Sequence, residues 1–272
     1  MSSITVADSS QSQASAGLSD LARGFAAMPT AWGLAWADIV SRYRRTALGP
    51  FWMVAQQAIW VGSLTFVFRA VFGNNDPTYP VYLAIGLAVW GFIASCLTSS
   101  ADIFVNAKAQ ISAYPRPFTM HVLKAMFTRI IEFGHLALVF VVAALIFRPT
   151  IGPEAALFLP AAAIYLIAGF GVTLILASFG PAFRDLGPVV ASGTALGFII
   201  TPIMWTPNLL GGRAAVIELN PFHHFVSIAR DPLLGMIPPT DYWVSAASWA
   251  VGLLVAGVIA FVARRRDLFF HL

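Results

Sequence analysis

The sequence predicts an all-α integral membrane protein, a bundle of six transmembrane helices preceded by an amphipathic helix that lies in the membrane plane. The chain of 272 residues is 58% hydrophobic and only 10% charged, with a mean hydropathy of +0.79, whereas about a quarter of the residues in a soluble domain are charged. Several charge-poor stretches reach the roughly 20 residues that a spanning helix needs. Backbone groups find no water in hydrocarbon, so each spanning segment must be helical.

The beginning of the chain is small and polar, without the apolar core of a signal peptide. Residues 1–22 are expected to form a disordered cytoplasmic tail, and residues 23–272 a single transmembrane domain. The chain has one cysteine, Cys96, so no intrachain disulfide is possible. The formal charge of +4 would suit nucleic acid, but the arginines lie beside membrane-length segments, and no nucleic-acid partner is expected.

An amphipathic helix is expected over residues 25–46, because aromatic and aliphatic side chains recur at helical spacing from Trp32 to Tyr43. The end of this helix carries Arg42, Arg44 and Arg45. These arginines would face anionic lipid or a protein partner. A Leu-Gly-Pro sequence ending at Pro50 then supplies a bend into the first span, where proline is tolerated in the first turn. The alternative is a positive flank that only orients this span.

The charge-poor stretches place the six spans at about residues 49–72, 79–100, 121–147, 155–180, 187–207 and 242–263. Lysine and arginine crowd the span ends on the side of the amino terminus. The basic residues near the other side are Arg69, Arg148, Arg213 and Arg230. Positive residues favour the cytoplasmic side, so both termini are expected in the cytoplasm.

The first span has one polar stripe on an otherwise apolar surface. Trp52, Gln56, Trp60 and Ser63 follow one another at helical intervals and share a face, with Gln57 beside them. Lipid tails would reject the amides. A sugar chain suits such a stripe, because rings stack on apolar sugar faces and amides bond hydroxyl groups. Packing between helices, held by the glutamines, is the alternative.

In the third span, Arg129, Glu132 and His135 lie three residues apart. A Glu-x-x-His pair on a helix can form half of a carboxylate-bridged metal site, but no second half is visible. An ion pair between Arg129 and Glu132, with His135 as a hydrogen-bonded neighbour, is the simpler account. No metal ion is therefore expected.

Before the last span, Asn220 and Pro221 form the N-cap and first turn of a short helix. Phenylalanines form its apolar face, whereas His223 and Arg230 lie opposite, and Pro232 follows its end. This segment is too apolar to float free, so it is expected to dip back against the bundle as a re-entrant helix on the periplasmic side. A periplasmic cap without contact to a substrate is the alternative.

Several short motifs carry a resemblance to a known family. They are "DIVSRYRRTALGPFW", "YPRPF", "FRDLGPVV", "TPIMW" and "NPFHHFVSIARDPLLG", in this order along the chain. Together with six spans, they resemble the ABC-2 type permeases that export polysaccharides, the family of O-antigen, capsule and teichoic-acid exporters. The resemblance implies a permease without enzymatic activity in the bacterial inner membrane, working as a homodimer with two copies of a separate ABC ATPase subunit and exporting a lipid-linked glycan.

The nucleotide site is expected on the partner, because this chain has no Gly-rich loop ending in Gly-Lys-Ser or Gly-Lys-Thr. No cofactor is expected in this chain; ATP and Mg²⁺ would bind to the ATPase. The resemblance suggests that a coupling helix between Asp102 and Met120 contacts that ATPase, although this segment also fits an ordinary polar connector. The expected coupling residues are Asp102, Lys108, Tyr114 and Arg116.

Two further groups of site residues complete the expectation. The substrate pathway is assigned to Trp52, Gln56, Gln57, Trp60, Ser63, Phe198, Thr201 and Trp205. The lipid-headgroup or gate residues are Arg42, Tyr43, Arg44, Arg45, His223, His224 and Arg230. Two alternatives stay open, an exporter of a drug or small lipid from the same superfamily and, more distantly, an intramembrane enzyme using Glu132 and His135.

Overall fold

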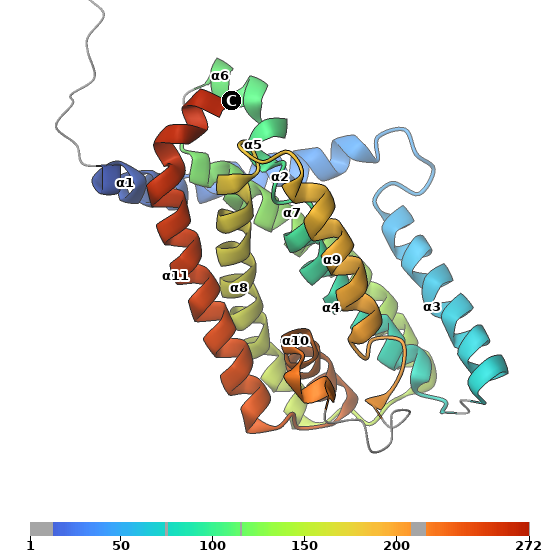
Figure 1. The fold of residues 1–272 in the computed structure, drawn as a ribbon. Coiled ribbons are helices and arrows are strands. Elements are labelled where there is room, and N and C mark those ends of the chain that lie inside the picture. Colours follow the sequence, from blue (N-terminus) through green and yellow to red (C-terminus); the bar gives the residue numbers. More distant parts are fainter. Residues whose placement is uncertain (1–12, 74–75, 115, 208–215, 272) are drawn as a thin grey trace, which may run out of the picture.

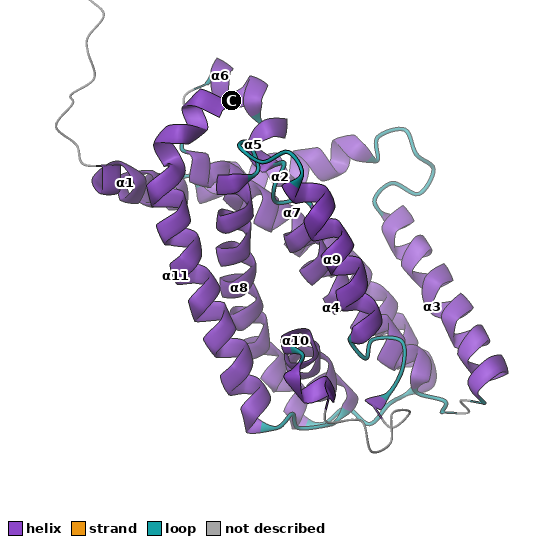
Figure 2. Cartoon of the chain, in the orientation of Figure 1, coloured by secondary structure: helices purple, strands orange, loops and turns teal. Residues whose placement is uncertain are grey.

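The computed structural model describes residues 13–73, 76–114, 116–207 and 216–271, and these residues form helices joined by loops and turns (Figure 2). The helices are α1 (Gln13–Ala26), α2 (Met28–Arg42), α3 (Phe51–Phe72), α4 (Tyr79–Thr98), α5 (Ile103–Asn106), α6 (Lys108–Ala113), α7 (Phe118–Phe147), η1 (Pro153–Leu157), α8 (Phe158–Phe179), α9 (Leu186–Ile200), α10 (Pro221–Arg230), η3 (Asp231–Leu234) and α11 (Thr240–His271). The all-α prediction is confirmed for the described residues.

The long helices run between two ends of the molecule (Figure 1). One end carries α1, α2, α5 and α6 together with the last turns of α11, and we call it the α2 end. The other end carries α10, and we call it the α10 end. Helix α7 packs against α1, α2, α3, α4 and α8, and α8 packs along α11. The described part of the amino terminus and the carboxyl-terminal helix therefore meet at the same end.

Among the residues that the structure describes, five helical segments are long and apolar enough to cross a membrane. They are Phe51–Val71, Tyr79–Thr98, Phe118–Phe147, Pro153–Phe179 and Thr240–Leu268. The expected span at 187–207 is helical only over the 15 residues of α9. Thr201 has an extended backbone because Pro202 follows it, and the helix ends there. The chain is thus a multi-pass membrane protein with five full-length candidate spans and one shorter apolar helix among its described residues.

The prediction for the amino-terminal region is wrong in two respects. Residues 13–22, expected in a disordered tail, belong to α1, while residues 1–12 lie outside the described part of the chain. The single helix expected over 25–46 is two helices that meet at Ala27, and the second ends at Arg42. Arg45 has a positive φ of 68°, which is incompatible with a continuing α-helix.

Helix α1 is ordered because a buried carboxylate fixes it to α7. Asp20, 1% exposed, accepts hydrogen bonds from the backbone N–H groups of Phe118 and Thr119, at 3.3 and 3.0 Å. It also forms an ion pair with Arg265 of α11 at 3.1 Å. The carboxylate thereby satisfies two of the N–H groups that the start of α7 leaves without helical partners. One side chain joins three helices at the α2 end.

Glycines let α8 and α11 approach each other closely. A Cβ atom added to Gly171 would lie 2.5 Å from the backbone of Leu253 and Leu254, and one added to Gly257 would collide with the carbonyl of Gly171. Small residues at such contacts allow close van der Waals packing between helices in lipid, where no hydrophobic force drives helix association. This pair is the closely packed side of the bundle.

We expect Gly171→Ala to destabilise the protein by about 1–3 kcal/mol, because the added methyl group must displace backbone rather than a flexible side chain. The midpoint of thermal unfolding in detergent measures this change. Gly134→Ala on α7 is the matched control, since its Cβ would meet no atom within 4 Å. It should leave the midpoint unchanged or raise it slightly. Equal midpoints for the two variants would contradict the close approach.

Asp20→Asn should release α1, because an amide brings a donor against N–H groups that need an acceptor. The free energy of local opening should fall by about 1–3 kcal/mol, measured as faster hydrogen exchange across α1. Asp185→Asn, at an exposed position before α9, is the control and should leave exchange unchanged. Unaltered protection of α1 in Asp20→Asn would refute the role of this carboxylate.

Candidate functional site

Helix α3 stands apart from the rest of the bundle at one side (Figure 1). It contacts α4 and α7, and among its described side chains only Met53 and Val61 are buried. The stripe expected from the sequence, Trp52, Gln56, Trp60 and Ser63, is exposed along its whole length. The structure therefore leaves this face available to lipid, water, a ligand or a second protein.

A cavity of about 460 Å³ lies between α3 and α7. Gln56, Gln57 and Trp60 line it from α3, and Glu132 lines it from α7. The Nε2 atom of Gln57 is buried without a hydrogen-bond partner among the described residues. The glutamines thus do not hold α3 to α7 by direct hydrogen bonds, as the packing interpretation of this stripe would require.

The polar end of α2 is bound to α7 by an ion pair. The Arg42 Nη1 atom lies 2.7 Å from Glu132 Oε1, so the expected pairing of Glu132 with Arg129 is wrong. Arg44 and Arg45 are exposed beyond the helix end, and Tyr43 is half-buried. Because Arg42 and Glu132 are 90 residues apart in sequence, local spacing could not identify this pair.

Arg129 is buried at 3% exposure and is held by hydroxyl groups rather than by a carboxylate. It donates hydrogen bonds to Thr173 of α8 at 2.6 Å and to Ser100 and Ser99, after α4, at 2.8 and 3.2 Å. His135 instead uses Nδ1 for a hydrogen bond with the carbonyl of Ile131 at 2.8 Å. Among the described residues, no group of three or more His, Cys, Asp or Glu side chains could hold a metal ion.

Helix α10 packs among α4, α8 and α11 at one end of the bundle (Figure 1). The expected N-cap is confirmed, because the Asn220 side chain accepts a hydrogen bond from the Phe222 N–H at 3.0 Å. Every residue from His223 to Arg230 is buried. The polar face expected on this helix is therefore turned into the protein.

Arg230 fixes the segment that follows α9. Its Nη1 donates to the carbonyl of Pro202 at 2.7 Å, and its guanidinium lies 4.3 Å from the ring centre of Tyr82. The Tyr82 hydroxyl donates to the carbonyls of Pro202 and Trp205, at 2.9 and 3.0 Å. These bonds satisfy backbone carbonyls that the end of α9 leaves free. The sequence did not indicate the role of Tyr82, because its partners are more than a hundred residues away.

The expected pathway residues on and after α9 contact the same region as Arg230 and Tyr82. Phe198 packs on the Trp90 ring with centroids 5.6 Å apart, and Thr201 is fully buried and accepts a hydrogen bond from Asn220. Trp205 is half-buried and donates to the carbonyl of Ile199. Phe198 lies on α9, which packs against α4, whereas Thr201 and Trp205 follow the end of α9. The structure therefore does not bring these residues together with the stripe on α3 within one chain.

Two histidines connect α10 to α11. His223 Nε2 lies 3.3 Å from the Tyr242 hydroxyl, which donates to Glu218 Oε1 at 2.7 Å. His224 Nδ1 lies 2.7 Å from the Ser245 hydroxyl. Burial lowers the pKa of His223 to about 4, and the nearby charge of Arg230 acts in the same direction. His223 is thus neutral at neutral pH.

The residues expected to contact an ATPase lie at the opposite end, around α5 and α6. Asp102, Lys108, Tyr114 and Arg116 are exposed. Phe104 is fully buried against Phe118 with ring centroids 5.2 Å apart, which anchors α5 to α7. The segment therefore combines a fixed apolar base with an exposed polar surface.

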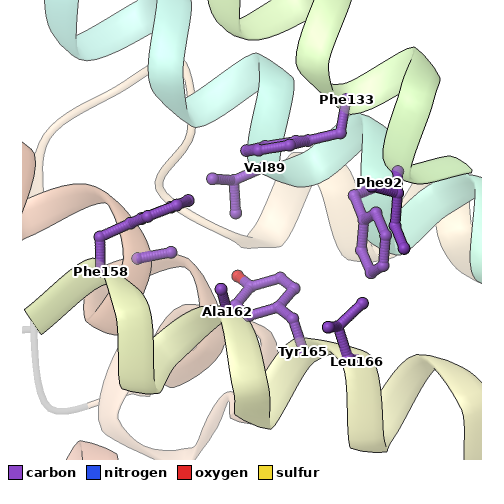
Figure 3. A pocket seen from close by; sticks show the side chains of 9 residues that line it. Val89, Phe92, Phe133, Phe158, Ala162, Tyr165 and Leu166 are labelled. Carbon is purple, nitrogen blue, oxygen red and sulfur yellow. The ribbon is translucent and has the colours of Figure 1, made fainter.

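An apolar cavity of about 220 Å³ lies among α4, α7, α8 and α10 (Figure 3). Phe133 and Phe158 stack at 6.2 Å beside it, and Figure 3 shows Tyr165 and Val89 on its wall. The Tyr165 hydroxyl is buried and has no partner among the described residues. No sequence pattern indicates this cavity, because its lining consists of apolar residues of the kind found throughout the spans.

The fold is that of a multi-pass membrane protein (Figure 1). Long apolar helices run along it, α2 lies across one end, and the buried helix α10 lies at the other. Comparison with protein families gives the class. Residues 30–234 match the model described as ABC-2 type transporter, and the chain belongs to this family.

Three curated relatives carry the name "O-antigen export system permease protein RfbA". One from Klebsiella pneumoniae is 30% identical over 71% of this chain and 76% of its own length. A second from Klebsiella pneumoniae is 26% identical over 75% of this chain and 80% of its own. One from Myxococcus xanthus is 21% identical, covering 85% of this chain and 90% of its own.

We expect acidification to destabilise the contact between α10 and α11. Between pH 6.5 and about 4, an exposed histidine binds a proton and the buried His223 does not, so this part of the stability is present above pH 6.5 and is lost as pH falls. The midpoint of thermal unfolding at pH 7.5 and 5 measures it. His223→Gln should reduce the difference, whereas His135→Gln should not. Identical pH dependence in wild type and His223→Gln would contradict this account.

Proposed function

We propose that this chain is the transmembrane permease of an ABC transporter that exports a lipid-linked polysaccharide of the O-antigen or capsule type across the bacterial inner membrane. The observation that carries the proposal is the exposed stripe of rings and amides on α3, in a chain of the ABC-2 type transporter family. Aromatic rings offer stacking surfaces to sugar rings, and amides bond hydroxyl groups without introducing a fixed charge. The names of the three relatives support the same cargo.

The pathway forms between two copies of the chain. Helix α3 buries few of its side chains, and Thr194 is the buried residue within α9. In a dimer with a twofold axis, each contact between the protomers occurs twice. An exposed face of α3 in one protomer can therefore pack against an exposed face of α9 in the other, and the reverse. The α3 stripe of one copy then faces the α9 helix of the other, and the glycan passes between them.

Power comes from two copies of a separate ATPase subunit that bind ATP and Mg²⁺. The sequence of this chain lacks the phosphate-binding loop that such hydrolysis requires. The exposed surface of α5 and α6 supports contact with the ATPase. A displacement of α5 by the ATPase would pass directly to α7, because Phe104 of α5 is buried against Phe118 of α7. Basic residues concentrate near this end, which supports a cytoplasmic location for both termini.

The α2 end admits the lipid-linked substrate from the inner leaflet. Trp32, Trp36 and Val40 are exposed along α2, as expected for a helix whose rings lie at the level of the lipid headgroups. Arg44 and Arg45 are exposed at its end and would attract the phosphates of the lipid carrier. At the other end, α10 and the segment after α9, which Arg230 and Tyr82 hold together, close the exit until α9 and α10 separate.

Export of a drug or small lipid is the rival within the same family. It would favour an apolar path, and the 220 Å³ cavity beside Tyr165 is the feature that suits it. An intramembrane enzyme using Glu132 and His135 finds less support. Glu132 is paired with Arg42, and His135 with a backbone carbonyl. The two side chains therefore do not point at one common position where a substrate could bind.

The test is ATP turnover by the chain purified together with its ABC ATPase subunit. A lipid-linked polysaccharide should stimulate turnover, and Trp60→Ala should reduce this stimulation about tenfold, equal to about 1.4 kcal/mol. Phe66→Ala is the control, because Phe66 is an exposed ring on α3 that lies about a third of a turn around the helix from Trp60. Stimulation by small lipids alone would favour the rival, and turnover by the isolated chain would overturn the permease assignment.

A further inference from the structure

A polar cavity of about 600 Å³ lies between α2, the end of α4, the α5–α6 segment and α7. From α7 it is lined by His121, Lys124, Thr128, Arg129 and Glu132, among others. These positions recur at three- and four-residue intervals and share one face of the helix. The cavity lies on the side of α7 that faces α2, and it is larger than a single small ion requires.

The charges around this cavity do not balance within the chain. Lys124 Nζ lies 2.6 Å from Asp38 Oδ2, and Arg42 Nη1 lies 2.7 Å from Glu132 Oε1. Both lining carboxylates are therefore matched by a cation. Arg129 is the third lining cation, and among the described residues no carboxylate lies within ion-pair distance of it.

Burying a charge without a counter-charge is unfavourable, and hydroxyl groups offset this only in part. Thr173, Ser99, Ser100 and the Met126 sulfur accept hydrogen bonds from the guanidinium of Arg129, but none of them carries a negative charge that would neutralise it. The bonds to hydroxyl groups come from two different helical regions, so the group is held in place before any ligand arrives. A fixed, uncompensated guanidinium on the wall of a cavity is suited to bind an anion.

A second unsatisfied group lines the same cavity. His121 is 3% exposed, and its Nε2 atom is buried without a hydrogen-bond partner among the described residues. A buried polar atom without a partner is rare in folded proteins and calls for a ligand or ordered water. His121 lies two turns before Arg129 on the same face of α7, so one ligand of moderate size can approach both.

We propose that this cavity binds a phosphate group, held by Arg129 with His121 and Lys124 as further donors. A planar guanidinium fork matches the oxygens of a phosphate, and the remaining volume accommodates a substituent on that phosphate. The source is either the headgroup of a membrane lipid or a soluble phosphate. The site lies on the other side of Glu132 from the α3 stripe, since Glu132 lines both cavities, and it does not depend on which cargo the transporter carries.

The ion pair between Lys124 and Asp38 makes the proposal sharply testable. The Asp38 side chain is 49% exposed, so its replacement leaves the fold intact. Asp38→Asn removes a negative charge beside the site and frees Lys124, so it should strengthen phosphate binding. Lys124→Gln removes a donor and leaves Asp38 unneutralised, so it should weaken binding. Each change should be about threefold to tenfold, as expected for one charge a few ångströms from the ligand in a partly solvated cavity.

The experiment uses the full chain purified in dodecyl maltoside, a detergent without phosphate. Inorganic phosphate, glycerol 3-phosphate and dioctanoyl phosphatidic acid are titrated separately by calorimetry. Saturable binding of the lipid alone identifies a headgroup site, and binding of the soluble probes identifies a soluble phosphate. In either case, Arg129→Gln should weaken binding at least about tenfold, Arg129→Lys should retain part of it, and the exposed Arg69→Gln should match wild type.

The absence of saturable binding by all three probes would overturn the proposal. Binding that neither Asp38→Asn nor Lys124→Gln alters would also overturn it, because the phosphate would then lie elsewhere. Should Arg129→Gln fail to fold, the opposite shifts of these two variants still decide the question. A purely structural role of Arg129, as a link between helices, predicts no opposite shifts.

Discussion

The hydrogen bonds of Arg129 are the constraint on which the rest of the bundle depends. A cation that is 3% exposed must be satisfied wherever it lies, and Arg129 finds its acceptors in hydroxyl groups from two other regions of the chain and in the nearby Met126 sulfur. Thr173 fixes α8 to α7, and Ser99 with Ser100 fixes the end of α4. Since α7 also contacts α1, α2 and α3, this one buried group links the helix at the centre of these contacts to α4 and α8.

The two sides of the bundle are packed very differently. Glycine brings α8 and α11 to backbone contact, whereas α3 and α9 keep most of their surfaces open. Close packing resists movement because interiors deform little, and a loosely held helix can shift without losing many contacts. The arrangement suits a permease in which a rigid half supports helices that must part, with α10 at one end and the α5–α6 segment at the other.

Much of the fold could be predicted, and less of the site. The stripe from Trp52 to Ser63 was predicted from helical periodicity, and the structure places it on one exposed face as expected. The cap at Asn220 was confirmed because its signal lies within three residues. The partners of Glu132 and Arg129 were predicted wrongly, since both are contacts between segments distant in sequence. Helix α1 was missed because its contacts are with residues distant in sequence: Asp20 bonds the start of α7, and Leu21 packs in an apolar cluster with α7, α8 and α11.

The sequence by itself determined that this protein is helical and crosses a membrane, because lipid leaves a backbone no other way to satisfy its hydrogen bonds. Hydropathy and proline positions also located most helix ends, because both signals act within a few residues of the end. Only the tertiary structure decided which groups meet: Arg42 with Glu132, Asp20 with Arg265, and Arg129 with uncharged hydroxyl and sulfur acceptors. Charged groups pair with the groups that lie close to them in space, and the spacing of residues along the chain does not reveal which groups these are.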